Sequence, residues 1–262
     1  MDPLAIYFTG TAGAGKTTLC RGFRTWMEGA GYDAVTVNLD PGMEAPSYEP
    51  DIDIRDWVKL KDIMDDYNLG PNGAQVAASD MIALKVYEVR EALERLNSDY
   101  ILVDTPGQVE LFAFRESSKA IVEALTGERS LIAFLFDPSL AKQPGGFVSL
   151  LMLAATVQFR FGLPMLNVLA KEDILSAAER ADVVRWSEEP YSLYEAVTRP
   201  TMTPDVTLSS ELFRALESMG PLWSLVFTSA EKATGMEDIY ASAQRAFAAG
   251  EDLERSGGPT EE

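Results

Sequence analysis

One glycine-rich segment carries the residues best suited to hold phosphate. Gly10-Thr11-Ala12-Gly13-Ala14-Gly15-Lys16-Thr17 satisfies the pattern G-x-x-x-x-G-K-[ST], and Thr18 follows it. Glycines let the backbone wrap so that successive N–H groups point at phosphate, and a following helix adds the positive end of its dipole. We expect Lys16 to reach the β and γ oxygens and Thr17 to ligate Mg²⁺. Residues 10–18 are therefore predicted to bind a nucleoside triphosphate.

A second segment supplies groups for the far end of that nucleotide. Asp104-Thr105-Pro106-Gly107-Gln108 follows an apolar run directly. Asp104 is predicted to hold Mg²⁺ through water, and Gly107 to offer its backbone N–H to the γ-phosphate. Gln108 and Glu110 lie where an amide or a carboxylate orients an attacking water. This chemistry needs no imidazole, and the chain contains no histidine.

The choice of base is predicted from two later loops. Ala170-Lys171-Glu172-Asp173 partly matches the guanine-reading pattern N-K-x-D. Asp173 is expected to accept hydrogen bonds from guanine N1–H and the exocyclic amine, which adenine does not supply, and Lys171 to lay its stem over the base. Ala170 departs from the pattern because the amide that normally fixes this loop is missing. Ser229-Ala230 resembles the short element that offers a backbone N–H to guanine O6, so the two loops together favour GTP over ATP.

Apolar runs and helical periodicity indicate the elements that position these loops. Strand-length apolar runs at 4–8, 34–39, 100–103, 131–136, 165–169 and 224–227 are separated by helix-sized segments, including 16–28 and 81–96. Such alternation predicts an α/β fold of the P-loop NTPase type, a three-layer structure with a mostly parallel sheet, helices on both faces, and ligands at the carboxyl ends of the strands. The domain is predicted to span 1–249, with a helical insertion at about 175–222 containing helices near 176–186 and 209–219, followed by a disordered acidic tail at 250–262.

Composition limits the partners and the location. The 262 residues include 41 acidic and 22 basic ones, and the resulting charge of −19 opposes direct binding of nucleic acid. The sequence shows no signal peptide and no membrane span, so we expect a cytoplasmic protein. The apolar run 147–157 is interpreted as a core helix rather than a surface for a dimer or a client. The single Cys20 is expected to be buried and structural.

Two further motifs give the set a family resemblance. Asn38-Leu39-Asp40-Pro41 ends the second predicted strand, and Gly70-Pro71-Asn72 reads by itself as a turn. Together with the phosphate loop, 104–108 and 170–173, in this order and spacing over roughly 4–240, they resemble the GPN-loop GTPases.

The resemblance implies a Mg²⁺-dependent homodimer that binds GTP and GDP. Asn72 of one subunit would enter the nucleotide site of the other and approach the γ-phosphate, while Asp40, Gln108 and Glu110 organise the attacking water and Asp104 the Mg²⁺ shell. Lys16 completes the predicted catalytic set. The resemblance also implies a role in assembling a client protein complex, of the RNA polymerase type.

Two alternatives remain open at this point. The same phosphate loop occurs in small-molecule and polynucleotide kinases, with the 175–222 insertion as an acceptor lid, although that insertion is acidic. A binding module in which nucleotide only holds a dimer together is the other, and the intact set of Lys16, Thr17, Asp104 and Gln108 argues against it.

Overall fold

A seven-stranded parallel sheet forms the middle of three layers. The computed structural model describes residues 3–43, 48–198 and 224–247. The strand order is β3-β2-β4-β1-β5-β6-β7, and every neighbouring pair is parallel. The strands are β1 (Leu4–Gly10), β2 (Ala34–Asn38), β3 (Ile52–Asp53), β4 (Tyr100–Asp104), β5 (Ser130–Phe136), β6 (Met165–Leu169) and β7 (Leu225–Phe227). The predicted P-loop NTPase architecture is confirmed, whereas the two-residue β3 escaped prediction because it has too few residues to show a periodic pattern.

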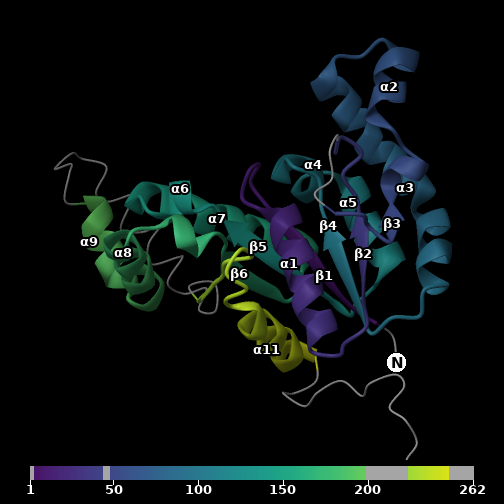
Figure 1. Cartoon of the computed structure of the whole chain (residues 1–262). Coiled ribbons are helices and arrows are strands. Elements are labelled where there is room, and N and C mark those ends of the chain that lie inside the picture. Colours follow the sequence, from purple (N-terminus) through teal and green to yellow (C-terminus); the bar gives the residue numbers. More distant parts are fainter. Residues whose placement is uncertain (1–2, 44–47, 199–223, 248–262) are drawn as a thin grey trace, which may run out of the picture.

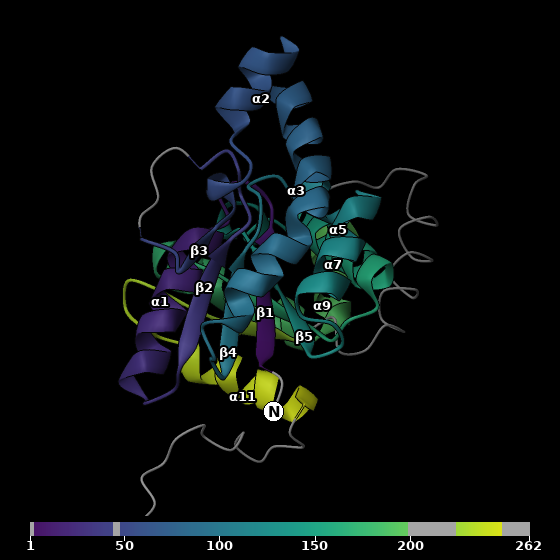
Figure 2. The same cartoon turned by 90° about the vertical axis from the view of Figure 1, so that its right-hand side faces the viewer.

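Helices cover both faces of this sheet (Figures 1 and 2). On one face, α1 (Lys16–Gly29) and α11 (Met236–Phe247) pack on alternate strand residues such as Leu4, Ile6 and Phe8. The other face carries α3 (Pro71–Glu94), α4 (Val109–Ala113), α5 (Glu116–Leu125), α7 (Pro144–Phe161), α8 (Ala177–Glu188) and α9 (Pro190–Thr198). β1, β2, β4 and β5 are buried along their whole length, which is why they read as continuous apolar runs in the sequence.

The Gly70-Pro71-Asn72 segment begins a helix, so its interpretation as a turn was wrong. Gly70 is the N-cap of α3 and Pro71 occupies its first turn, where the missing N–H of proline leaves no bond unmade. The helical stripe was predicted only from Met81 because the earlier buried positions, Ala74 and Ala78, carry small side chains. α2 (Leu60–Tyr67) and the adjoining end of α3 project beyond the sheet (Figures 1 and 2).

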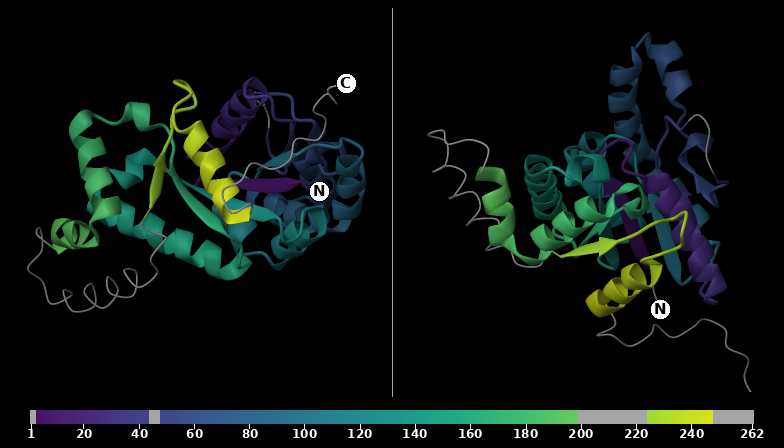
Figure 3. Two further views of the ribbon diagram at one scale, coloured as in Figure 1. Left: turned by 90° about the horizontal axis from the view of Figure 1, so that it is seen from below. Right: turned by 60° about the vertical axis from the view of Figure 1, so that its left-hand side comes forward.

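The predicted insertion begins with two helices at the opposite end of the molecule from α2 (Figures 1 and 3). α8 lies where a helix was expected near 176–186. Ser176 and Glu179 form a capping box that fixes where this helix begins. The helix predicted at 209–219 and the tail predicted at 250–262 lie outside the described residues. Three short elements complete the described chain: η1 (Ile54–Asp56), α6 (Pro138–Ala141) and η2 (Glu172–Ile174).

α7 is the one helix in residues 3–43, 48–198 and 224–247 whose length and composition would allow it to cross a membrane. Core helices of globular proteins meet the same criteria. Phe147, Leu151 and Val157 of this helix are buried, and they belong to the core on the α3 face of the sheet. Met152 and Phe159 are exposed, so the helix expected at 147–157 packs on the core along one face only.

Candidate nucleotide site

The loops predicted to bind nucleotide meet at the carboxyl ends of the central strands. The phosphate loop (residues 10–17) follows β1, and the segment 39–43, called the Asp40 loop, follows β2. The segment 105–108, called the Gly107 loop, follows β4, and the segment 170–173, called the guanine-type loop, follows β6. Because the sheet is parallel, these four ends share one edge, where ligands of such folds bind. A cavity of about 610 Å³ beside Arg90 and Arg129 lies at the amino ends of the strands instead, away from all four loops.

The phosphate loop has the backbone conformation that its glycines permit. Gly15 has a φ of +98° immediately before α1, and Gly10 has a φ of +148°. A Cβ at Gly10 would lie 2.7 Å from the Leu135 carbonyl oxygen, so only glycine fits against β5. The loop and the helix N-terminus together present the arrangement of N–H groups that binds phosphate.

Lys16 is buried in this loop and donates its ammonium hydrogens to backbone oxygens. The acceptors are the carbonyls of Gly10 and Thr11, each at 3.0 Å, and of Gly107 at 2.8 Å. Burial lowers the pKa of Lys16, while Asp104, Asp40 and Glu110 act in the opposite direction. A phosphate entering the loop would replace carbonyl oxygens with charged ones at the same ammonium.

Asp104 is a buried carboxylate without hydrogen-bond partners. Asp104 is 0% exposed, and neither of its carboxylate oxygens accepts a hydrogen bond of normal geometry. Burial raises the pKa of Asp104 to about 7, although the Thr17 hydroxyl and the Lys16 ammonium lower it. An orphaned carboxylate next to a threonine hydroxyl suits a hard cation such as Mg²⁺, which prefers oxygen ligands. Asp104 and Thr17, the two predicted metal residues, therefore fit such an ion.

Asp40 joins the Asp40 loop to the Gly107 loop. One carboxylate oxygen, Oδ1, accepts the Gly42 N–H at 2.9 Å, and Oδ2 accepts the Gly107 N–H at 3.1 Å. The Asp40 N–H donates to the Asn38 side-chain oxygen at 2.9 Å. Both carboxylate oxygens are thus engaged, and one of them holds the very N–H that was expected to face a γ-phosphate.

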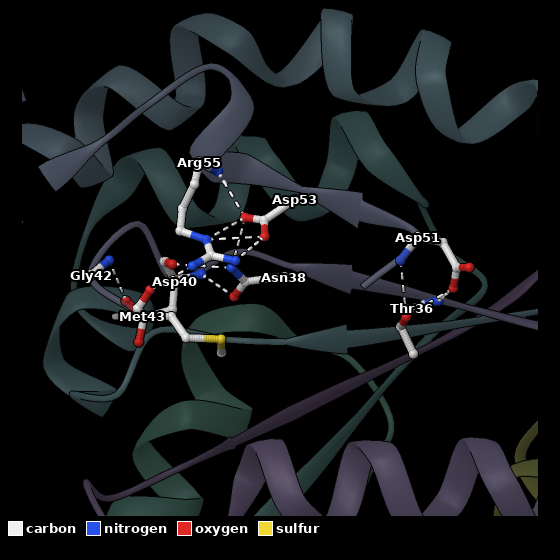
Figure 4. A network of polar contacts seen from close by, with 8 residues as sticks. All are labelled: Thr36, Asn38, Asp40, Gly42, Met43, Asp51, Asp53 and Arg55. Carbon is white, nitrogen blue, oxygen red and sulfur yellow. Dashed lines mark hydrogen bonds and ion pairs between the residues drawn. The ribbon is translucent and has the colours of Figure 1, made fainter. Parts of the chain in front are cut away.

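A polar network beside this loop was not predicted from the sequence (Figure 4). The Asn38 amide donates to Asp53 at 3.0 Å and to the Asp40 carbonyl at 3.2 Å. Arg55 pairs with Asp53 through its guanidinium and also donates to the Met43 carbonyl at 2.7 Å. Asp53 stands in β3, so the strand that was missed carries the support of the predicted catalytic carboxylate.

Three predicted catalytic side chains lie exposed around these loops. Gln108 is the N-cap of α4, Glu110 lies in the first turn of that helix, and Asn72 lies in the first turn of α3. Within the described residues, none of the three side chains forms a hydrogen bond or ion pair with Lys16, Asp40 or Asp104. Glu110 acts on Lys16 through its charge. The structure thus brings Lys16, Asp40, Asp104 and Gly107 together, and leaves Asn72 facing outward.

Three of the four residues predicted to contact the base, Lys171, Asp173 and Ala230, line a small cavity. It has a volume of about 160 Å³ and is lined by Gly15, Thr18, Leu19, Ala170, Lys171, Asp173, Ile174, Ala230 and Glu231. Lys171 has a φ of +53° and donates to the Gly13 carbonyl at 2.5 Å, which ties the guanine-type loop to the phosphate loop. The Ser229 N–H donates to the Thr234 carbonyl at 3.2 Å, so Ala230 is the better placed of the two to offer an N–H to a base.

Comparison with known proteins agrees with this geometry. Residues 8–249 match a family model described as a conserved hypothetical ATP binding protein. The chain is 31% identical to GPN-loop GTPase PAB0955 of Pyrococcus abyssi over 253 residues, which cover 95% of this chain and 100% of that protein. It is also 31% identical to GPN-loop GTPase 1 of Dictyostelium discoideum over 248 residues, covering 91% of this chain and 60% of that longer protein.

A solved structure has the same fold over nearly the whole chain. It is the crystal structure of PAB0955, described as a GTPase in apo form from Pyrococcus abyssi, and it matches with a TM-score of 0.81 and 30% sequence identity. The match covers 93% of this chain and 97% of the other. The family description names ATP, whereas the named relatives are GTPases. The Asp173 loop matches the guanine-reading pattern in part.

Proposed function

The chain belongs to the GPN-loop GTPase family, and on that premise we propose that it works as a Mg²⁺-dependent homodimeric switch driven by GTP hydrolysis. We further propose that this switch is cytoplasmic and serves the assembly of another protein complex, as the resemblance to the family implies. The GTPase activity follows from membership of the family. The switch, the trans contact and the client are the parts that need testing.

The observation that best supports the switch is that Gly107 forms hydrogen bonds through both its backbone N–H and its backbone carbonyl. Its N–H is held by Asp40 and its carbonyl by Lys16, and these are the residues that a γ-phosphate would engage. Binding of GTP would draw the Gly107 N–H and the Lys16 ammonium onto phosphate oxygens. Asp40 Oδ2 would then be free to accept a hydrogen bond from the attacking water, and loss of phosphate would restore the present contacts.

Mg²⁺ would be held by Thr17 and, through water, by Asp104. When bound, such an ion neutralises the charge on the β and γ oxygens. The phosphate loop and Lys16 would hold the phosphates. Asp40 and the exposed Gln108 and Glu110 would orient the attacking water. The buried, unpartnered oxygens of Asp104 are the feature that supports metal binding.

The position of Asn72 supports a trans role. This side chain is exposed in the first turn of α3, at the projecting end of the helix, and it makes no hydrogen bond in the described part of the chain. Gln75, one turn further along, approaches Gly42 in the Asp40 loop, so the start of α3 lies at the border of the site. A neutral amide donor at that border would stabilise phosphoryl charge in a neighbouring subunit.

Mixing two inactive variants tests the trans role directly. Lys16→Ala destroys the phosphate site of its own subunit, and Asn72→Ala removes the donor that this subunit would supply to its partner. After unfolding and refolding as an equimolar mixture, random pairing gives mixed dimers with one complete site, so about a quarter of wild-type GTP turnover should return. A cis role for Asn72, or a monomer in solution, predicts no recovery at all.

A further inference from the structure

The guanine-type loop of this chain needs a support that its sequence pattern does not supply. Position 170 carries alanine, 2% exposed, in place of the asparagine whose amide would fix the loop. The loop still carries Asp173, the residue expected to distinguish guanine from adenine. A carboxylate reads two base donors only when its orientation is fixed, because misplaced acceptors lose most of their hydrogen-bond energy.

The Glu172 side chain connects this loop to two other parts of the structure, helix α8 and the turn at Thr234. Its Oε2 atom accepts from the Arg180 guanidinium at 2.9 Å, and its Oε1 atom accepts from the Thr234 hydroxyl at 3.0 Å. Its backbone N–H donates to the Thr228 carbonyl at 2.9 Å. The Glu172 side chain is 17% exposed, much less than the 49% of Arg180, so this carboxylate is largely shielded from water.

Both partners of Glu172 are themselves fixed. The Arg180 guanidinium lies over the Phe227 ring at 5.0 Å from its centroid, which anchors it to the end of β7. Thr234 closes the turn that contains Ala230, since Ser229 and Thr234 exchange backbone hydrogen bonds of 3.2 and 3.1 Å. Glu172 therefore connects the loop of Asp173 with the turn of Ala230, and these two line the same cavity.

We propose that Glu172 is the positioning residue for guanine selection in this chain, and that its carboxylate takes over the loop-fixing role of the amide absent at position 170. This proposal rests on the GTP site described above. Glu172 does not line the base cavity, so it acts through Asp173 and Ala230. Loss of the carboxylate frees both loops to shift, which weakens contacts to the guanine edge and leaves contacts to the phosphates in place.

Affinities for GTP and ATP in Mg²⁺, measured by calorimetry, give the first test. Glu172→Ala and Thr234→Val should each lower the GTP affinity about tenfold, with ATP affinity nearly unchanged. The double variant should lose little more than either alone, because both changes break the same contact. Asp182→Asn is the matched control, since it removes a half-exposed acid of α8 that forms an ion pair with Arg185.

A rescue variant separates positioning from general damage. Ala170→Asn restores the missing amide, so Glu172→Ala/Ala170→Asn should recover guanine preference. Equal losses of GTP and ATP affinity in Glu172→Ala, or unchanged guanine preference, would overturn the proposal. Glu172→Gln, which keeps the size and one acceptor oxygen, answers the same question should the alanine variant fail to fold. A wild-type protein without preference for GTP would instead refute the guanine site itself.

Discussion

Asp40 Oδ2 and the Gly107 N–H lie 3.1 Å apart, so a predicted catalytic carboxylate holds the group that was expected to bind the γ-phosphate. The two residues are 67 positions apart in the sequence and meet because β2 and β4 are neighbours in the sheet. Without phosphate, the N–H of Gly107 needs another acceptor, since an unmade bond at a partly buried amide is costly. Asp40 supplies that acceptor.

This relationship predicts the behaviour of Asp40→Asn. The amide keeps the size of the side chain and one acceptor oxygen, so GTP affinity should change less than about threefold. Turnover should fall by about 10² to 10³, because a neutral amide is a poor acceptor for the proton of the attacking water. Steady-state phosphate release and calorimetric GTP binding measure the two quantities.

Asp62→Asn provides the comparison for that variant. Asp62 is an exposed acid in the first turn of α2, and the same change of charge there should leave turnover within about twofold of wild type. If Asp40→Asn retained full turnover, Asp40 would be a structural acceptor for Gly107 and no more.

The sequence predicted most of the sheet because buried parallel strands are written as apolar runs. β6 was predicted with its observed bounds, and the other long strands within one or two residues. β3 has two residues and borders a segment without periodicity, so pattern alone does not reveal it. The start of α3 was missed because Gly70-Pro71-Asn72-Gly73 has the composition of a turn, while burial of Ala74 and Ala78 decides for a helix.

In the candidate site, too, residues in local sequence patterns were predicted and residues that act through distant contacts were not. Lys16, Asp104 and Asp173 were predicted because each stands in a local pattern next to a strand end. Asp53, Arg55 and Glu172 act through partners 8 to 62 positions away, or through an element too short to recognise, and no spacing rule reports such contacts. Sequence therefore predicted the residues expected to touch nucleotide, and the fold revealed the residues that hold them.

Asp104→Asn should make the nucleotide-free protein more stable at alkaline pH. Because folding raises the pKa of Asp104 to about 7, the native chain keeps this proton where the unfolded chain, with a pKa of 3.8, has lost it. The wild-type contribution is complete below about pH 4 and is lost as pH rises through 7, at a cost on the order of 4 kcal/mol. The neutral amide removes that cost.

Urea unfolding of both proteins at pH 5 and pH 8, without metal or nucleotide, checks this sign. The variant should gain stability relative to wild type at pH 8 and much less at pH 5. GTP turnover should be lost at both, because an amide is a weaker metal ligand than a carboxylate. A variant that is destabilised equally at both pH values would mean that the native carboxylate is not held near neutrality.

Gly15→Ala should disrupt the phosphate loop. Gly15 has a φ of +98°, and a Cβ there would lie 2.9 Å from the Lys171 side chain that crosses the loop. We expect a loss of about 1–2 kcal/mol in unfolding free energy and no measurable GTP binding. Gly29→Ala, at the end of α1, has no atom within 4 Å of its new Cβ and should be neutral or slightly stabilising.

Asp53 and Asp51 offer a matched pair for testing what supports the Asp40 loop. Both hold β3 beside β2 (Figure 4): Asp51 accepts from the Thr36 N–H at 2.8 Å, and Asp53 accepts from the Asn38 amide at 3.0 Å. Burial would raise the pKa of Asp53, but hydrogen bonds from Arg55 and Asn38 hold it below its usual range. Only Asp53 reaches the residue that orients Asp40.

Asp51→Asn and Asp53→Asn should each cost about 1–2 kcal/mol of unfolding free energy, because each weakens charge-assisted hydrogen bonds. Asp53→Asn alone should also lower GTP turnover, by about tenfold at saturating GTP, since Asn38 and the Arg55 contact to Met43 then loosen around Asp40. Phosphate release measured beside urea unfolding separates the two effects. Equal turnover in the two variants would show that β3 supports the fold of this region without directing Asp40.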